Sequence, residues 1–206
     1  QTCALPISFT VDSPIVSTLS EYNAFSLDAG TASIVFNANI GGTTTVTALG
    51  EFTVFEADNG LTFGGADSNT GLGGAGPVTL INTDGAIDFG VENNVIGGTG
   101  IVLNGGAGAS TLRIQTTGDS VRFNGATTLA SQVVIDTDST DNNSEGGTVT
   151  FTNDAPLDSA SGEHNDLTLD VGTASVRFNE DIGGTQSIGV FTITEADAGV
   201  IFGEAD

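Results

Sequence analysis

The residues of this sequence best suited to chemistry are four carboxylates in the segment DTDSTDNNSE, namely Asp136, Asp138, Asp141 and Glu145. Calcium binds through about six to eight oxygen ligands, and an Asp-x-Asp pair opens many calcium loops. Here the loop glycine is not at the required position, and the third ligand is out of register. A weak calcium loop is one interpretation. We favour the other, an insertion loop that its charge keeps in solution.

Other catalytic groups are scarce. The single histidine, His164, lies in SGEHND, and Tyr22 occupies the matching position of an earlier repeat, so we expect a solvated turn residue and not a catalytic base. The serines lack a base to activate them, and no GxSxG elbow occurs. The glycine-rich stretches 71–76 and 105–108 have the character of turns and not of phosphate loops. We therefore predict no catalytic and no cofactor-binding residue.

The surface must be strongly negative, because 26 acidic residues stand against three arginines and the formal net charge is -23. Nucleic acid is excluded as a partner, since phosphate binding requires clustered Lys and Arg. The charge also disfavours binding to anionic membranes. The sequence contains no apolar run of about 18 residues, the length needed to insert into a bilayer. Salt or divalent cations would reduce the repulsion among the charges of such a surface, which favours an extracellular location.

The first eight residues, QTCALPIS, differ in character from the rest and resemble the translation of a sequencing adapter. We expect residues 1–8 to be non-native and to contribute nothing specific to the core. Cys3, the single cysteine, lies in this segment, so the remaining chain offers no disulfide and no thiolate metal site.

A long internal repeat follows. The segment FTVDSPIVSTLSEYNAFSLDAGTASIVFNANIGG at 9–42 returns at 151–184 as FTNDAPLDSASGEHNDLTLDVGTASVRFNEDIGG, an offset of 142 (151 minus 9) with roughly half of the positions identical. FTVFEADNGLTFGGAD at 52–67 returns at 191–206, an offset of 139 (191 minus 52). We therefore expect one full long repeat at 9–150 and the start of a second at 151–206.

A shorter unit of strand, glycine turn and strand recurs at 25–37, 111–124 and 167–179. Strands recur about every 20 to 35 residues, the size of one solenoid coil and less than a sandwich domain. One coil cannot enclose a core, whereas stacked coils bury continuous columns of Val, Ile, Leu and Phe. This predicts an all-β solenoid of about 7–8 stacked coils, with tandem β-sandwich domains as the alternative. We expect the copies at 25–37 and 167–179 to superpose as equivalent coils, with Leu27, Phe36, Leu169 and Phe178 pointing inward.

An asparagine follows the last inward residue of several strands, as in the Phe-Asn pairs at 36/37, 123/124 and 178/179. Stacked amides could form a hydrogen-bonded ladder at a corner of the solenoid. Alternatively, asparagine is there because it tolerates a left-handed turn conformation.

Segments such as LTLDVGTASVRFNEDIGG, VVIDTDSTDNNSEGGTVTFTNDAPLDS and IGVFTITEADAGVIFG resemble the strand repeats of giant bacterial surface proteins of the filamentous-haemagglutinin and autotransporter-passenger kind. The resemblance covers nearly all of residues 9–206. It implies a right-handed parallel β-helix that acts as an extracellular stalk or adhesin at the bacterial cell surface, with surface glycans or other cell-surface components as partners. It brings no catalytic residues with it.

Two other functions compete with this one. A carbohydrate-active β-helix enzyme is disfavoured, because the chain has no Lys or Trp and only one Tyr with which to hold a sugar. A subunit of an extracellular filament is the second alternative, since uncapped solenoid ends are templates for end-to-end self-association.

Overall fold

The computed structural model describes residues 5–9, 14–42, 47–64, 78–105, 110–138 and 145–203. In this part of the chain every named element is a β-strand, as the vocabulary of Val, Ile, Thr, Phe and Gly predicts. No helix there is long and apolar enough to cross a membrane. The strands form three sheets, which we call A, B and C.

The strands are short, and each sheet collects strands that are far apart in the sequence. Sheet A contains β1 (Ile7–Phe9), β3 (Ile34–Phe36), β5 (Leu61–Phe63), β8 (Ile101–Leu103), β11 (Thr127–Leu129) and β14 (Leu157–Ser159). Sheet B contains β6 (Leu80–Asn82), β9 (Thr111–Gln115), β12 (Gln132–Asp136), β15 (Leu167–Asp170) and β17 (Phe191–Glu195). Sheet C contains β2 (Phe25–Asp28), β4 (Phe52–Glu56), β7 (Ile87–Phe89), β10 (Val121–Phe123), β13 (Val149–Phe151), β16 (Ser175–Phe178) and β18 (Gly199–Phe202).

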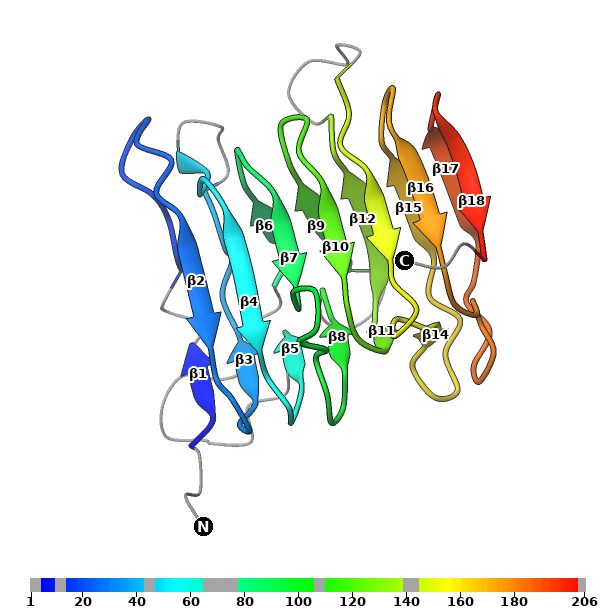
Figure 1. Cartoon of the computed structure of the whole chain (residues 1–206), viewed down its shortest axis with the longest axis horizontal. Coiled ribbons are helices and arrows are strands. Elements are labelled where there is room, and N and C mark those ends of the chain that lie inside the picture. The colour runs from blue at the N-terminus through cyan, green and yellow to red at the C-terminus, as the bar shows by residue number, and fades with distance from the viewer. Residues whose placement is uncertain are drawn as a thin grey trace.

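The chain visits the faces in the cyclic order A, B, C, so that each circuit is one coil. Sheet C has seven strands, one for each coil. In some coils sheets A and B have no named strand, and an isolated parallel bridge takes its place. Such bridges run from Ile15 through Ile40 to Ile81 in sheet B, and from Leu157 to Ile182 in sheet A. In Figure 1 the colours accordingly run from blue at one end of the stack to red at the other without mixing.

All pairings between named strands are parallel, and nearly all are in register, as between Val121 of β10 and Val149 of β13. This confirms the parallel β-helix. It also excludes the alternative of tandem sandwiches, whose hairpins would pair antiparallel. The seven coils agree with the number expected from the spacing of the strands.

Alternate side chains of each strand point inward and stack on their counterparts in the next coil. Phe36 and Leu169 are fully buried, Phe178 almost so, and Leu27 in the first coil packs against the core from a partly buried position, as predicted. One column of rings runs down sheet C, with centroids 4.5 to 5.5 Å apart. Its members are Phe89, Phe123, Phe151, Phe178 and Phe202. Aromatic contacts thus join five successive coils, with four of the rings stacked and Phe89 tilted against Phe123.

Two asparagines at the corners, Asn82 and Asn104, bind in neither of the expected ways. The Asn104 amide donates to the carbonyl of Gly64 in the preceding coil at 2.7 Å, and the Asn82 amide donates to Gly42 at 2.8 Å. They do not adopt a positive φ; the neighbouring glycines do, as at Gly64 (φ +71°). A side chain on Gly64 would collide with the Asn104 carbonyl. These two amides therefore tie their corners to the backbone of the preceding coil.

The two copies of the long repeat occupy different faces. The strands at 25–28 and 34–36 lie in sheets C and A, whereas their copies at 167–170 and 175–178 lie in sheets B and C. The expectation that the two copies are equivalent coils is therefore wrong, and they resemble each other only as local units. A unit of strand, glycine turn and strand fits more than one corner of the solenoid, because all three faces are parallel sheets with the same distance between strands.

The segment expected to be foreign to the fold contributes two residues to it. Ile7 and Ser8 belong to β1, where the Ile7 amide donates to the Ser33 carbonyl at 2.9 Å and its side chain packs against the core. The expectation that residues 1–8 make no specific contribution is therefore wrong for Ile7. That the segment is not native stays a prediction.

If the ring column holds the coils together, Phe123→Ala should lower the free energy of unfolding by about 3–5 kcal/mol, because it leaves a cavity between two stacked rings. Phe55→Ala is the matched control, since the Phe55 side chain is exposed on β4, and should cost about 0.5 kcal/mol or less. Urea unfolding of both variants measures the difference. Equal losses would contradict the packing.

Candidate functional site: a carboxylate cluster on sheet B

The carboxyl-terminal ends of the sheet B strands line up a column of polar side chains. The ladder registers place Asn82 beside Gln115, Gln115 beside Asp136, Asp136 beside Asp170, and Asp170 beside Glu195. Successive coils are about 4.8 Å apart, so these side chains are close neighbours. The column begins with amides and ends with three carboxylates, which places like charges side by side.

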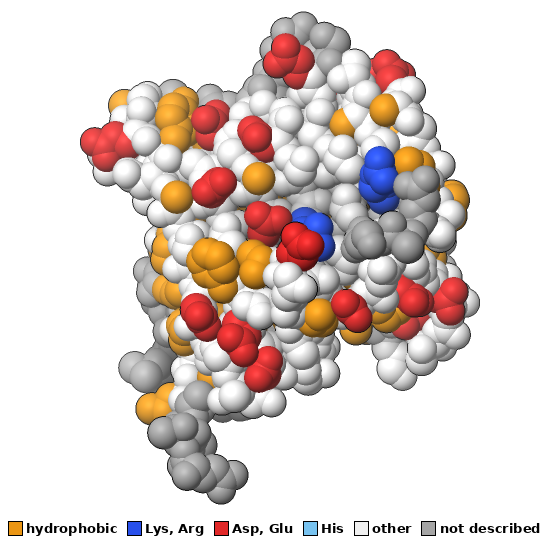
Figure 2. Space-filling view, viewed as in Figure 1, with side chains coloured by type: hydrophobic (Ala, Val, Ile, Leu, Met, Phe, Trp, Pro, Cys, Tyr) orange, Lys and Arg blue, Asp and Glu red, His pale blue; other side chains and the backbone are white. Residues whose placement is uncertain are grey.

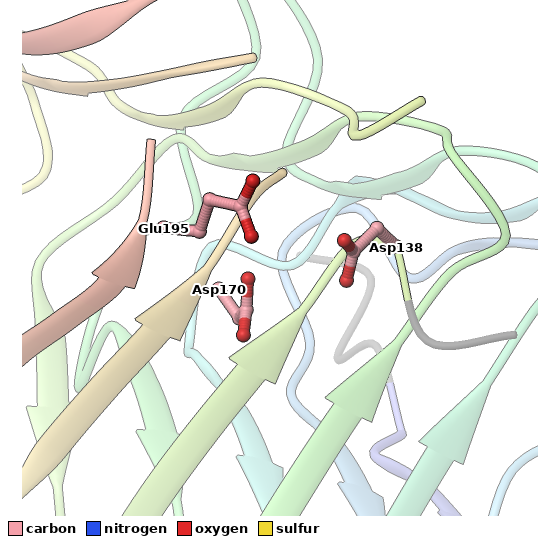
Figure 3. Close-up of side chains that lie close together, drawn as sticks. All are labelled: Asp138, Asp170 and Glu195. Atoms are coloured by element: carbon pink, nitrogen blue, oxygen red, sulfur yellow. The ribbon is translucent and has the colours of Figure 1, made fainter. Parts of the chain in front are cut away.

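Three carboxylates meet beside the end of this column. Asp138, Asp170 and Glu195 each offer an oxygen that lies within 4.8 Å of the other two. Asp138 follows β12, Asp170 ends β15 and Glu195 ends β17, so the cluster spans three successive coils (Figure 3). The environment changes across it, from the buried Asp138 to the exposed Glu195.

Gly172 lies next to two of these carboxylates, those of Asp138 and Asp170. Its φ of +52° suits a residue without a side chain, and a Cβ there would lie 3.0 Å from Oδ2 of Asp138. The Gly172 N–H also donates to the Asp170 carboxyl. One oxygen of that carboxyl, Oδ1, is buried without a hydrogen-bond partner. Burial and then the negative charge of Asp138 raise the pKa of Asp170, and the Gly172 hydrogen bond opposes the rise.

The four carboxylates singled out in the sequence do not gather together in the described part of the structure. Asp138 joins the cluster, whereas Asp136 points to Arg113, with 3.5 Å between the carboxylate and the guanidinium. Glu145 is exposed and does not belong to the cluster, and Asp141 lies outside the described residues. Asp170 and Glu195 take part instead, and the loop interpretation missed them.

A signal for these two residues was present in the repeats. Asp170 and Glu195 are the copies of Asp28 and Glu56, which also pair across neighbouring coils, with the same register shift. Aligning the strands that end at Asp136, Asp170 and Glu195 by their last residues would have placed the carboxylates in one column. Unequal loop lengths between the strands hide that alignment in the linear sequence.

The cluster can hold a proton or attract a cation, since both relieve the repulsion among three carboxylates. In the described residues it is the one group of three or more His, Cys, Asp or Glu side chains close enough for a metal. Three carboxylates supply at most six oxygens, and an exposed Glu195 is not fixed in place by its surroundings. The geometry thus permits a weak cation site without building a closed one.

The remaining polar groups form no second centre in the described residues. His164 is exposed in its turn, with Nδ1 3.0 Å from the Ser187 carbonyl oxygen. Arg122 and Arg177 lie on sheet C and are separated by Thr150 of the strand between them. Arg113 lies on sheet B, where its guanidinium is 3.5 Å from the Asp136 carboxylate, so these three basic side chains do not cluster.

Comparison with protein-family models, with curated protein sequences and with solved structures finds no match to this chain. The site is therefore interpreted from its own chemistry.

The pKa values of Asp88, Asp119 and Asp170 are all raised, with burial as the largest cause in each. The folded chain then binds protons that the unfolded chain, with an ordinary Asp pKa of about 3.9, has lost. Stability must therefore fall as pH rises from about 3.9 through the raised values. We predict a higher melting temperature near about pH 4.5 than near about pH 7.5 at fixed ionic strength. A maximum at or above neutral pH would contradict the assignment.

Asp170→Asn should raise the melting temperature at neutral pH, because the amide keeps an acceptor for Gly172 and removes the charge facing Asp138. Asp28→Asn is the matched control, since Asp28 accepts the Gly30 N–H at 3.0 Å in the equivalent turn and pairs with Glu56 but belongs to no group of three carboxylates in the described chain. Thermal unfolding followed by circular dichroism compares them. A larger gain from Asp28→Asn would show that the cluster is not a site of repulsion.

Millimolar calcium should raise the melting temperature no more than sodium at equal ionic strength, because both screen the acidic surface. A specific site occupied at a hundredfold excess over Kd would add about 2.7 kcal/mol beyond that control. A calcium-specific gain that disappears in Asp138→Asn/Asp170→Asn would overturn the screening account and establish a site. If it disappears instead in Asp136→Asn, the loop interpretation gains support.

Proposed function

We propose that this chain is a structural or adhesive segment of a large secreted bacterial surface protein, at the cell surface and without catalytic activity. The observation that carries the proposal is the uninterrupted stacking of parallel strands over seven coils in sheet C. Such a stack transmits load and presents long, regular faces, and each coil needs only its neighbours for stability.

The shift of the repeat between faces supports the same function. The segment 9–42 begins in sheet A with β1, and its copy at 151–184 begins in sheet C with β13. Because a repeat stacks on its predecessor from any face, an array can grow by duplication without loss of register. A surface feature of the repeat then appears on successive faces around the shaft, which suits presentation to targets in several directions.

The charge of the surface supports an extracellular setting. Figure 2 shows acidic side chains spread over the visible face, among large areas of backbone and uncharged side chains. With a net charge of -23, the folded chain is favoured by the salt and divalent cations of an external medium. The resemblance to filamentous-haemagglutinin and autotransporter-passenger repeats points the same way, with glycans or other surface components as partners.

A carbohydrate-active enzyme is the competing function. A hollow of about 520 Å³ lies at the last coil, and Glu180 and Asp181 are among the residues that line it. Two carboxylates suffice for glycoside hydrolysis when their separation is right. However, the aromatic walls of the hollow are Phe178 and Phe202, which belong to the core column and are not a separate sugar platform.

Purified chain should therefore release no reducing ends and no unsaturated uronates from a panel of neutral and acidic polysaccharides, and should bind surface glycans or cell-surface extracts without turning them over. Glu180→Gln/Asp181→Asn is the control, and it should behave as the parent chain does. Turnover by the parent that this variant loses would replace the structural function with the enzymatic one.

A further inference from the structure

The loop between β14 and β15, at 159–165, projects from the side of the coil stack. Its residues 161–164 are all exposed, although coils of the same chain lie on both sides of it. On one side the Asn165 side chain donates to the Leu129 carbonyl at 2.8 Å, and on the other the Gly189 N–H donates to the Asn165 carbonyl at 2.8 Å. The exposure of this loop therefore does not result from a missing neighbour.

The internal repeat contains this loop twice, as STLSEYN at 17–23 and as SASGEHN at 159–165. A Ser, a Glu and an Asn are common to both copies, and so are their hydrogen bonds. The buried Ser hydroxyl accepts the Asn backbone N–H, at 2.9 Å in the first copy and at 2.8 Å in the second. The Asn side chain donates both to this hydroxyl and to the Glu carboxylate. These three residues thus form a constant frame.

The backbone of the two copies follows the same path. The N–H of the constant Glu donates to the carbonyl three residues earlier, at 3.0 Å in the first copy and at 2.9 Å in the second. The residue before the Glu has a positive φ in both, 79° at Gly162 and 59° at Ser20. Because a serine adopts this conformation less readily than a glycine, the path is kept even where the residue type disfavours it.

A glycine of the next coil holds each loop in place. In both copies it donates its N–H to the carbonyl of the constant Asn, from Gly50 at 3.1 Å and from Gly189 at 2.8 Å. A Cβ on either glycine would collide with the carbonyl of the residue before that Asn. In the second copy the Gln186 side chain also donates to the Glu163 carbonyl at 2.9 Å. A loop held in this way loses little conformational freedom when it binds a ligand.

The residues at the tip of the loop differ between the copies. Positions 18–20 are Thr-Leu-Ser and positions 160–162 are Ala-Ser-Gly, while His164 stands where the first copy has Tyr22. Binding residues are often found on loops that a rigid scaffold positions. A constant frame with a variable tip is suited to such a role, because the frame holds the tip in place and the tip residues set the specificity.

The tip of the second copy is rich in hydrogen-bond acceptors. The Glu163 carboxylate has about four acceptor positions, and the Asn165 amide uses one of them. Nδ1 of His164 lies 3.0 Å from the Ser187 carbonyl oxygen. Because a carbonyl oxygen only accepts, Nδ1 carries the proton, and Nε2 of the neutral ring is an acceptor. The net charge of -23 repels anions. The tip therefore suits a neutral ligand with several hydroxyl donors, which is the chemistry of a saccharide.

We propose that the loop at 159–165 binds a neutral saccharide, whose hydroxyls donate to the Glu163 carboxylate and to Nε2 of His164. Ser159 and Asn165 are positioning residues that hold the carboxylate at the tip. This inference rests on the proposed adhesive function, to which it assigns a site and a ligand class. The loop is an interaction surface and not a second catalytic or metal centre.

Binding to immobilised polysaccharides tests the proposal. Mannan, dextran and galactan are the neutral probes and polygalacturonate is the acidic one, and biolayer interferometry measures the Kd of the full chain for each. We expect binding to at least one neutral probe and not to polygalacturonate, because the net charge of the chain opposes an anionic polymer. Glu163→Gln/His164→Ala should weaken this binding about tenfold or more, since it removes a charged acceptor and the ring acceptor.

Two further variants separate the tip from the frame and from charge. Glu92→Gln removes the same charge from an exposed carboxylate in the turn between β7 and β8, and should leave binding unchanged. Ser159→Ala keeps Glu163 and His164 but releases Asn165, and should also weaken binding. Circular dichroism melting checks that each variant is folded.

Unchanged binding in Glu163→Gln/His164→Ala, or equal weakening by Glu92→Gln, would overturn the proposal and leave the adhesive function in place. A parent chain that binds none of the neutral probes would overturn it as well. If that chain also binds no cell-surface extract, the adhesive part of the proposed function fails with it.

Discussion

Parallel pairing of each strand with its counterparts above and below is the constraint on which the rest of this structure depends. A three-residue strand such as β10 buries two side chains and could not fold alone. Pairing with β7 and β13 satisfies its backbone on both sides and places Phe123 between two rings. Each residue of a strand is therefore stacked on its counterpart in the next coil. A position of the strand must accordingly be occupied by side chains that pack well against similar side chains.

Stacking apolar residues on one another stabilises the fold, whereas stacking like-charged residues destabilises it. Stacked phenylalanines share buried surface, whereas Asp138, Asp170 and Glu195 share a negative field that raises the pKa of Asp170. The cluster is thus a product of the same geometry as the core. The amides of Asn82 and Asn104 donate to carbonyls of the preceding coil, so uncharged polar side chains can strengthen the stack.

The sequence was sufficient to predict an all-β parallel solenoid, its number of coils and its inward residues, because alternation and repeat period are local properties of the chain. It could not assign copies to faces. The unit of 25–37 has the same strands and turn as that of 167–179, and only the loops between units decide which corner each occupies. The partners of Asp138 were missed for the same reason, since Asp170 and Glu195 come from the next two coils.

The central claim, that successive coils add one strand spacing each along a single axis, is tested most directly by spin-label distances on sheet C. With Cys3 replaced by Ser, labels at Ser26 and Thr150 are four strands apart, and labels at Ser26 and Arg177 are five strands apart. At about 4.8 Å per strand, double electron–electron resonance should give mean separations near about 19 and 24 Å between the labelled backbone positions, once the label linkers are allowed for. Equal separations, or a shorter one for Arg177, would show that the coils do not form one continuous stack.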